Sequence, residues 1–178
     1  MPRLSHLTIL AVATAPLSDR GISRIAKKLT HLTELRLLRH RNITRVDLRN
    51  LRNLRRTPTR FLSWCPQLRL INMSGLQRLV KLQPLAFQSA MLQSVNLTHL
   101  TSLRIIEHSA FNFCKSLISL KLSGMPRVEE IGDDFMYGCT KLSAVDLSSL
   151  SLLTTIGPGA FQNCPFLISI KLPLRLRR

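Results

Sequence analysis

The sequence contains few aromatic residues, few glycines and no long apolar run. Phe, Trp and Tyr make up only 5% of the 178 residues, so leucine, isoleucine and valine must supply most of the buried surface. No apolar run reaches the roughly 18 to 20 residues that cross a bilayer, so we expect no membrane span. The 7 glycines are too scattered to form a phosphate-binding loop.

Motifs of catalysis and metal binding are also missing. Gly-x-Ser-x-Gly, His-Glu-x-x-His and Cys-x-x-Cys do not occur, and the five histidines occupy unrelated positions. Asp133 and Asp134 suit a helix N-terminus better than a metal site, since no further carboxylate cluster accompanies them. We therefore predict a chain that is not an enzyme and has no cofactor, metal or small-molecule substrate.

Acidic residues are scarce, and this gives the chain a strong positive charge. Twenty-six Lys and Arg face 9 Asp and Glu, for a net charge of +17. Residues 1–78 carry most of the excess, and arginine, whose planar fork matches phosphate oxygens and stacks on bases, dominates there. We predict that this half binds RNA or another polyanion through Arg36, Arg39, Arg41, Arg45, Arg49, Arg52, Arg55, Arg56 and Arg60.

The chain repeats itself every 24 or 25 residues. Leu-x-x-Leu-x-Leu or a close variant begins at Ile43, Leu68, Leu92, Leu117 and Leu142. Such self-similarity is typical of a solenoid, in which each unit buries its apolar face only against its neighbours. The period near two within the motif predicts one short strand per repeat, paired in parallel with the next.

A second segment of each repeat, Ala-Phe-x-x-Cys-x-x-Leu, spaces its apolar residues by one, three and three. This spacing favours one or two turns of α- or 3₁₀-helix on the side opposite the strand. We expect Gly132 and Gly157, just before this segment, to adopt positive φ, and Pro158 to suit the first turn of the helix.

The segment from Ile156 to Pro173, Ile-Gly-Pro-Gly-Ala-Phe-Gln-Asn-Cys-Pro-Phe-Leu-Ile-Ser-Ile-Lys-Leu-Pro, resembles the repeat of the BspA-like leucine-rich repeat family. The 25-residue variant is similar to leucine-rich repeat proteins of protozoa. The resemblance implies an α/β solenoid, a leucine-rich repeat horseshoe used for binding, in many members at a cell surface. It implies no catalytic residues.

We predict a single leucine-rich repeat domain over residues 1–178, with three parts. Residues 1–42 hold irregular repeats, 43–173 hold the regular ones, and 174–178 form a basic tail. Two further strand motifs, beginning at Leu4 and Leu32, lie in the irregular part at a step of 28 residues. The last repeat lacks a polar cap, so we expect exposed apolar residues there.

Four cysteines occupy one position of the repeat, three residues before the next leading leucine. They are Cys65, Cys114, Cys139 and Cys164, and Ser89 stands at the same spacing before Leu92. One cysteine per repeat predicts small buried thiols rather than a disulfide framework or a zinc site.

Strand side chains that point away from the core should form a polar concave face. We predict protein binding there through Asn72, Asn96, Lys121, Asp146 and Lys171. Asn42, Asn72 and Asn96 begin Asn-x-Ser/Thr sequons, which matter only in a secreted protein. The first residues have a faint signal-peptide pattern, but they also fit the first solenoid strand.

The leading functional hypothesis is a scaffold whose basic half docks on RNA inside a large ribonucleoprotein, such as a ribosome-like particle, with other proteins of the assembly on its later repeats. This implies an intracellular location, with a mitochondrial one as an option. Two alternatives stay open: a BspA-like surface antigen or adhesin at the cell surface, and an intracellular protein–protein adaptor.

Overall fold

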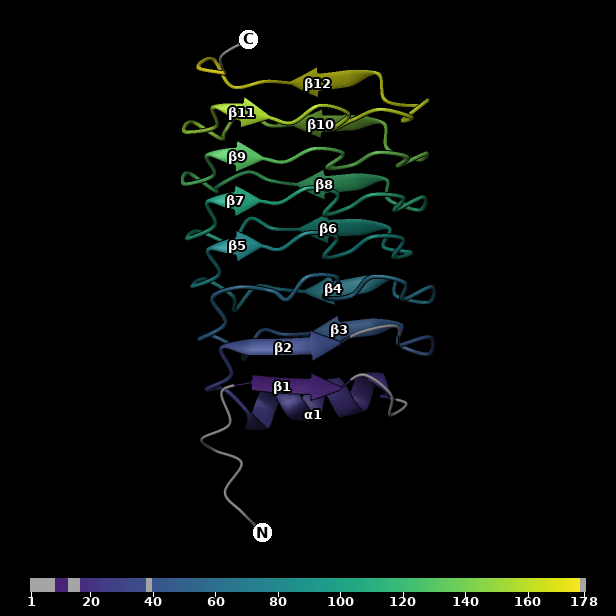
Figure 1. Ribbon diagram of the computed structural model, residues 1–178, viewed down its shortest axis with the longest axis vertical. Helices are drawn as coiled ribbons and strands as arrows, with labels where there is room; N and C mark the ends of the chain where they lie inside the picture. The colour runs from purple at the N-terminus through teal and green to yellow at the C-terminus, as the bar shows by residue number, and fades with distance from the viewer. Residues whose placement is uncertain (1–8, 13–16, 38–39, 177–178) are drawn as a thin grey trace.

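The protein is a stack of short coils, each one repeat long. The computed structural model describes residues 9–12, 17–37 and 40–176, with the side chains of residues 9–12 and 36 left aside. Successive coils lie one above the other from the N-terminal to the C-terminal end (Figure 1). The chain thus forms a solenoid, as the repeat predicts.

One side of the stack carries the strands that the leucine motif predicts, and we call it the first column. Its members pair in parallel as β3 with β4, β6 with β8 and β10 with β12. In β3, β6, β8 and β10 the central side chain is buried, as Val95 and Val145 are. The strands are β3 (Arg45–Asp47), β4 (Leu70–Asn72), β6 (Ser94–Asn96), β8 (Ser119–Lys121), β10 (Ala144–Asp146) and β12 (Ser169–Lys171).

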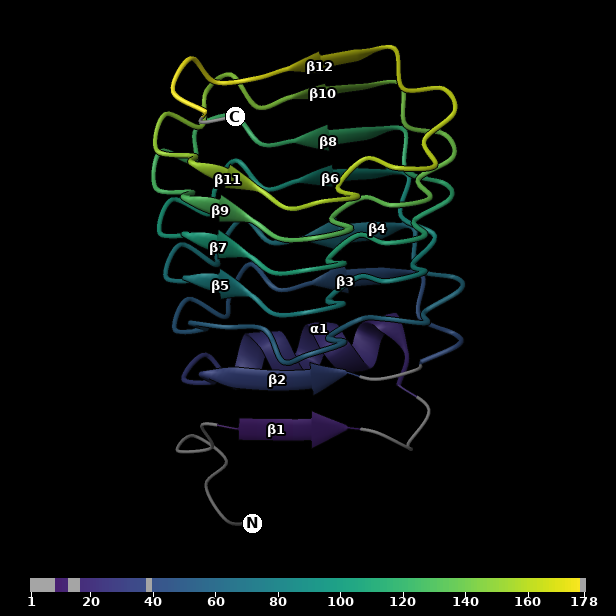
Figure 2. The ribbon, with the colours of Figure 1, turned by 45° about the horizontal axis from the view of Figure 1, so that its top comes forward.

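The opposite side carries a second column that the sequence analysis did not predict. It is a four-stranded parallel sheet of two-residue strands, and Arg56 extends it by a bridge to Lys81. Figure 2 shows the two columns on opposite sides of the coils. Each regular coil therefore has two strands rather than one. The second-column strands are β5 (Lys81–Leu82), β7 (Ile105–Ile106), β9 (Glu130–Ile131) and β11 (Thr155–Ile156).

The prediction of a helical segment in each repeat is wrong. Between the second column and the next first-column strand the chain makes tight turns, in which residues four apart have positive φ, such as Ser109 and Phe113 at 56° each. Their N–H groups donate to the coil above: Ser109 to the carbonyl of Asp133 at 2.7 Å and Phe113 to that of Tyr137 at 2.8 Å. An α-helix would use these groups internally, so the inter-coil bonds replace it.

Gly132 and Gly157 serve a different purpose from the predicted one. Neither has positive φ; among the described glycines that conformation occurs at Gly124, Gly138 and Gly159. A Cβ at Gly132 would lie 2.5 Å from the backbone nitrogen of His108 in the coil below. Glycine is therefore required because two coils approach closely here.

Aliphatic columns and a file of phenylalanines fill the interior. Phe87 and Phe111 stack with ring centroids 5.0 Å apart, and Phe111 meets Phe135 edge-on at 5.7 Å. Phe61 and Phe161 continue the file at 6.2 Å on either end. These contacts bind each coil to the next through the core.

The cysteines line the interior beside this file, which confirms that they are structural. All four are free; Cys65, Cys114 and Cys139 are buried and Cys164 is half-buried. Ala90, rather than Ser89, stands in their column. The coil that contains Ala90 is one residue shorter than the others, and the missing residue falls between Ala90 and Leu92, at a corner of the coil.

The N-terminal part departs from the repeat. β1 (Ile9–Val12) pairs in parallel with β2 (Glu34–Leu37) at a step of 25 residues, not the 28 predicted. Between them runs the helix α1 (Asp19–Lys28). Figure 2 shows β1 and β2 running in the direction of β5, with α1 below β3, where a first-column strand would otherwise stand.

The sequence explains α1 locally. The Ser18 side chain accepts a hydrogen bond from the Gly21 N–H at 3.2 Å and so caps the helix. Asp19 lies in the first turn and Lys27 and Lys28 in the last, which suits the helix dipole. One face buries Ile22 and Ala26 against the first coils.

The last described coil leaves apolar side chains exposed, as its lack of a polar cap predicts. Phe166 is 66% exposed and Ile168 89% exposed, since no coil among the described residues packs over them.

Candidate functional site: a basic groove and a polar strand face

The nine arginines predicted to bind a polyanion do not form one surface. The side chain of Arg36 and all of Arg39 lie outside the described residues. The other seven are exposed, but they are distributed around a coil: Arg45 and Arg49 flank the first column, while Arg55 and Arg56 lie at the second. The remaining three are Arg41, Arg52 and Arg60, which lie at turns. The segment is basic on every side.

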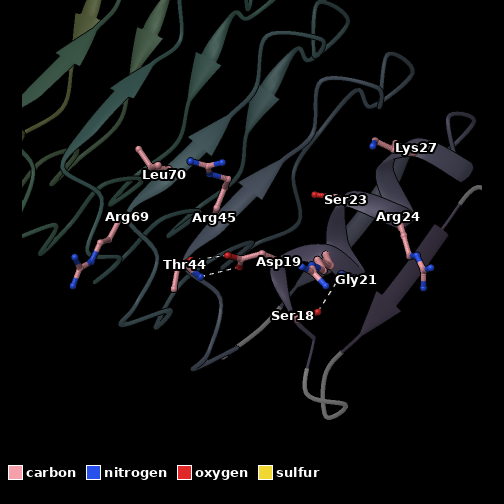
Figure 3. A pocket seen from close by; sticks show the side chains of 11 residues that line it. Ser18, Asp19, Gly21, Ser23, Arg24, Lys27, Thr44, Arg45, Arg69 and Leu70 are labelled. Carbon is pink, nitrogen blue, oxygen red and sulfur yellow. Dashed lines mark hydrogen bonds between the residues drawn. The ribbon is translucent and has the colours of Figure 1, made fainter.

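Basic side chains do gather in a groove between α1 and the start of the first column. The groove has a volume of about 870 Å³. Figure 3 shows Arg69, Arg45, Arg24 and Lys27 spread along it rather than converging on one point. It is lined by Ser18, Asp19, Arg20, Gly21, Ser23, Arg24, Lys27, Thr44, Arg45, Arg69 and Leu70. We call these residues the α1 groove.

The α1 groove has a single carboxylate, and it is already engaged. Asp19 accepts hydrogen bonds from the backbone N–H of Thr44 at 2.9 Å and from its hydroxyl. Burial raises the pKa of Asp19, but the bonds from Thr44 and the nearby Arg45 outweigh it, so the pKa is lowered on balance. Asp19 therefore stays ionised and cannot neutralise the whole groove.

No cation of the α1 groove lies within salt-bridge distance of a carboxylate among the residues that the structure describes, although Asp19 attracts Arg45 and Asp47 attracts Lys27. Other basic residues do lie that close: Arg49 pairs with Asp47 at 2.6 Å, and Arg104 pairs with Glu129 at 3.0 Å. The side-chain nitrogens of Arg20, Arg24, Arg45 and Arg69 thus keep their hydrogen-bonding capacity for a ligand.

Sequence reasoning identified Arg45 but missed the other cations of the groove. Arg20, Arg24 and Lys27 come from a helix that was not predicted, and Arg69 lies beside Arg45 only because consecutive coils stack. The sequence does contain features that indicate this helix: Ser18 as a cap, Asp19 in the first turn, and apolar residues at helical spacing after it.

The outer face of the first column holds the predicted protein-binding residues in one row. Asn72, Asn96 and Asp146 each use a side-chain oxygen to accept the N–H two residues later, at 3.0 Å. Their shared role is therefore to end each strand in a turn. Their other polar atoms, and Lys121 and Lys171, face outward; Lys171 lies 3.6 Å from Asp146.

The described residues show no arrangement typical of a catalytic or metal site. They contain no group of three or more His, Cys, Asp or Glu side chains placed to hold a metal. Burial raises the pKa of Cys139 to about 12 and that of Cys65 to about 11, so both thiols stay protonated and unreactive.

A membrane-spanning helix is not found in the part of the chain that the structure describes, where the ten residues of α1 fall well short of a bilayer's thickness.

Several solved structures align with this chain, and one of them, at a TM-score above 0.5, shares its solenoid fold. The pneumococcal vaccine antigen PcpA is 18% identical over 78% of this chain and 29% of its own, with a TM-score of 0.55. The T. pallidum leucine-rich repeat protein TpLRR is 19% identical, over 93% of this chain and 60% of its own, at a TM-score of 0.45. A leucine-rich repeat protein from Bacteroides ovatus is 18% identical, over 94% of this chain and 46% of its own, at a TM-score of 0.49.

The chain thus spans 29 to 60% of the length of these three proteins. No curated protein matches it significantly. A family model, the BspA type leucine-rich repeat region, matches residues 80–178 in six copies. Since this match covers more than half of the chain, the protein belongs to the BspA-type leucine-rich repeat family.

Proposed function

We propose that the protein is a non-catalytic scaffold that binds a partner protein along the outer face of the first column. The observation that carries the proposal is the row of polar and charged side chains on parallel strands, which pair in register as β3 with β4, β6 with β8 and β10 with β12. Ser94, Ser119 and Ser169 stand beside the row of Asn72, Asn96 and Lys121 and are exposed. Such a face is flat and rich in hydrogen-bonding groups, which suits the surface of another protein.

The family supports a protein partner more than an RNA partner. Leucine-rich repeat scaffolds commonly serve protein interaction, and the family match gives no support for RNA binding, a ribosome-like particle or a mitochondrial location. The dispersed arginines also weaken the RNA hypothesis, because a nucleic acid would contact only one side of the coil at a time.

A surface location is the second candidate, and family membership favours it. PcpA, which shares the fold, is a vaccine antigen. A chain displayed at the surface would bind its partner through the same strand face. Protease treatment of intact cells of the source organism distinguishes the two locations: a surface protein is cleaved, and an internal one is protected.

Photo-cross-linking in the source organism tests the partner. A photoreactive residue at Ser94 or Ser119 samples the first column. One at Thr101 or Thr154 samples an exposed position away from that column, Thr101 in the coil of Ser94 and Thr154 in the coil after that of Ser119. We expect one protein to be cross-linked from Ser94 and Ser119 and not from the controls, with nuclease treatment leaving the adduct unchanged. Cross-linking to RNA, or equal yields from all four positions, would overturn the proposal.

A further inference from the structure

The α1 groove has a composition and shape that differ from those of the polar strand face. Its cations are Arg20, Arg24, Lys27, Arg45 and Arg69, and its one carboxylate, Asp19, is bonded to Thr44. An excess of positive charges over carboxylates in a concave site raises the local concentration of an anionic ligand. The chain thus has a second surface of defined chemistry.

The arrangement of the cations argues for an extended ligand. Figure 3 shows them spaced along the groove, from Arg69 at one end to Arg24 and Lys27 at the other. A single phosphate or sulfate would need several donors converging on one point. A chain with anionic groups at intervals can instead engage each guanidinium in turn.

The groove also offers one apolar contact and no aromatic one. Leu70 is 44% exposed at its edge, beside Arg45 and Arg69. Recognition of single-stranded nucleic acid commonly stacks bases on aromatic rings, and none lines this groove. Carboxylates, by contrast, fit the forked guanidinium well, and an aliphatic side chain of a peptide can cover Leu70.

We propose that the α1 groove binds an extended acidic segment of a partner protein, rich in Asp and Glu and carrying an aliphatic residue for Leu70. The inference rests on the proposed function, since it assigns part of that partner to a second surface. Carboxylates of the segment pair with Arg24, Arg45 and Arg69, and Lys27 adds a further charge.

The test uses a fluorescent twelve-residue peptide of Glu and Asp with one central Leu, and fluorescence anisotropy with the full chain. The groove variant combines Arg24→Gln, Lys27→Gln, Arg45→Gln and Arg69→Gln. The matched control combines Arg52→Gln, Arg55→Gln, Arg56→Gln and Arg60→Gln, which removes the same charge from exposed side chains outside the groove. Thermal unfolding confirms that both variants fold.

We expect the groove variant to lose about tenfold or more in affinity and most of its salt dependence, and the control to lose no more than about threefold. Leu70→Ser should also weaken binding in the wild-type background. Equal losses in the two quadruple variants would show attraction by net charge alone and overturn the assignment. Tighter binding of a poly-uridine strand of equal charge, lost in the groove variant, would overturn it in favour of nucleic acid.

Failure of this inference is separable from failure of the proposed function. If the groove variant still cross-links the partner from Ser119 while no chain binds the peptide, only the groove assignment falls. If no protein is cross-linked from either first-column position while the peptide binds the groove, only the strand-face function falls.

Discussion

The carboxylate of Asp19 accepts two hydrogen bonds from Thr44, one from its backbone N–H at 2.9 Å and one from its hydroxyl at 2.5 Å. These bonds join the first turn of α1 to the residue before β3, 25 positions later. The carbonyl of Thr44 in turn accepts the N–H of Arg69 in the next coil at 2.9 Å. The helix is thus tied to the same edge of the stack that carries the first column, and this connection shapes the α1 groove.

Asp19→Ala should loosen α1 and lower the stability of the fold by an amount that depends on pH. Charge-assisted hydrogen bonds at a mostly exposed site are worth about 1 kcal/mol, so thermal unfolding at pH 7 should show a loss of that order. Because the pKa of Asp19 is lowered in the fold, its contribution is present above the ordinary value near 3.8 and disappears as the pH falls below it. The difference from wild type should therefore shrink toward pH 3. Thr44→Ser, which keeps the hydroxyl, should stay close to wild type; an equal gap at both pH values would contradict this account.

The cysteines should resist thiol reagents in the folded protein. The thiols of Cys114 and Cys139 lie 3.1 and 3.2 Å from carbonyl oxygens of the coil below, and burial raises the pKa of each. With Ellman's reagent at pH 8 we expect slow reaction of half-buried Cys164 alone, and of all four after unfolding. Cys164→Ala should abolish the native-state signal. Rapid labelling of Cys114 or Cys139 in the folded chain would contradict this account, because it would show that the reagent reaches the interior.

Phe111→Ala should destabilise the stack strongly. Phe111 contacts both Phe87 and Phe135 inside the file, and removing a buried phenylalanine ring costs about 3–5 kcal/mol. Phe113→Ala is the matched control. This ring is 40% exposed and meets the Tyr137 ring edge-on with centroids 5.4 Å apart, so we expect the free energy of unfolding to fall by only about 1 kcal/mol. Chemical denaturation measures both. Similar losses would mean that the file does not form the core.

Gly132→Ala should be much more harmful than Gly124→Ala. The new Cβ at position 132 would lie 2.5 Å from the His108 nitrogen, which is backbone and cannot move aside without separating two coils. We expect a loss of about 3 kcal/mol or failure to fold. A Cβ at Gly124 would have its nearest neighbour, the carbonyl oxygen of Thr98, 3.6 Å away, so space is not a problem there. Only the positive φ of 75° disfavours a side chain, and we expect Gly124→Ala to cost about 1 kcal/mol of stability. Thermal unfolding ranks the two; the reverse order would contradict the close approach.

The first column was predictable because alternation of buried and exposed residues is written directly into Leu-x-x-Leu-x-Leu. Two-residue strands such as Ile105–Ile106 are too short to show alternation, so the second column has no comparable signal. The apolar spacing of the segments between the second column and the next first-column strand fits both a helix and the tight turns that are found there. What decides between the two is hydrogen bonding to another coil, together with positive φ at residues such as Trp64 and Phe113, which no composition rule would choose.

The candidate site was less predictable than the fold. Counting arginines located the basic half of the chain, but a count does not say on which side of a coil each side chain lies. Arg45 and Arg56 are eleven residues apart and belong to opposite columns, whereas Arg45 and Arg69 are 24 apart and share the α1 groove. Proximity here follows the repeat length and not the sequence separation.

The short coil shows how such a gene can change in length. With one residue fewer between Ala90 and Leu92, the second-column strands and the turns between coils still pair in register. A codon can therefore be lost at this corner, and whole repeats can be duplicated or deleted, without depriving any remaining core side chain of its neighbours. Recombination between repeats, rather than substitution within them, is then an accessible route by which relatives acquire different numbers of coils.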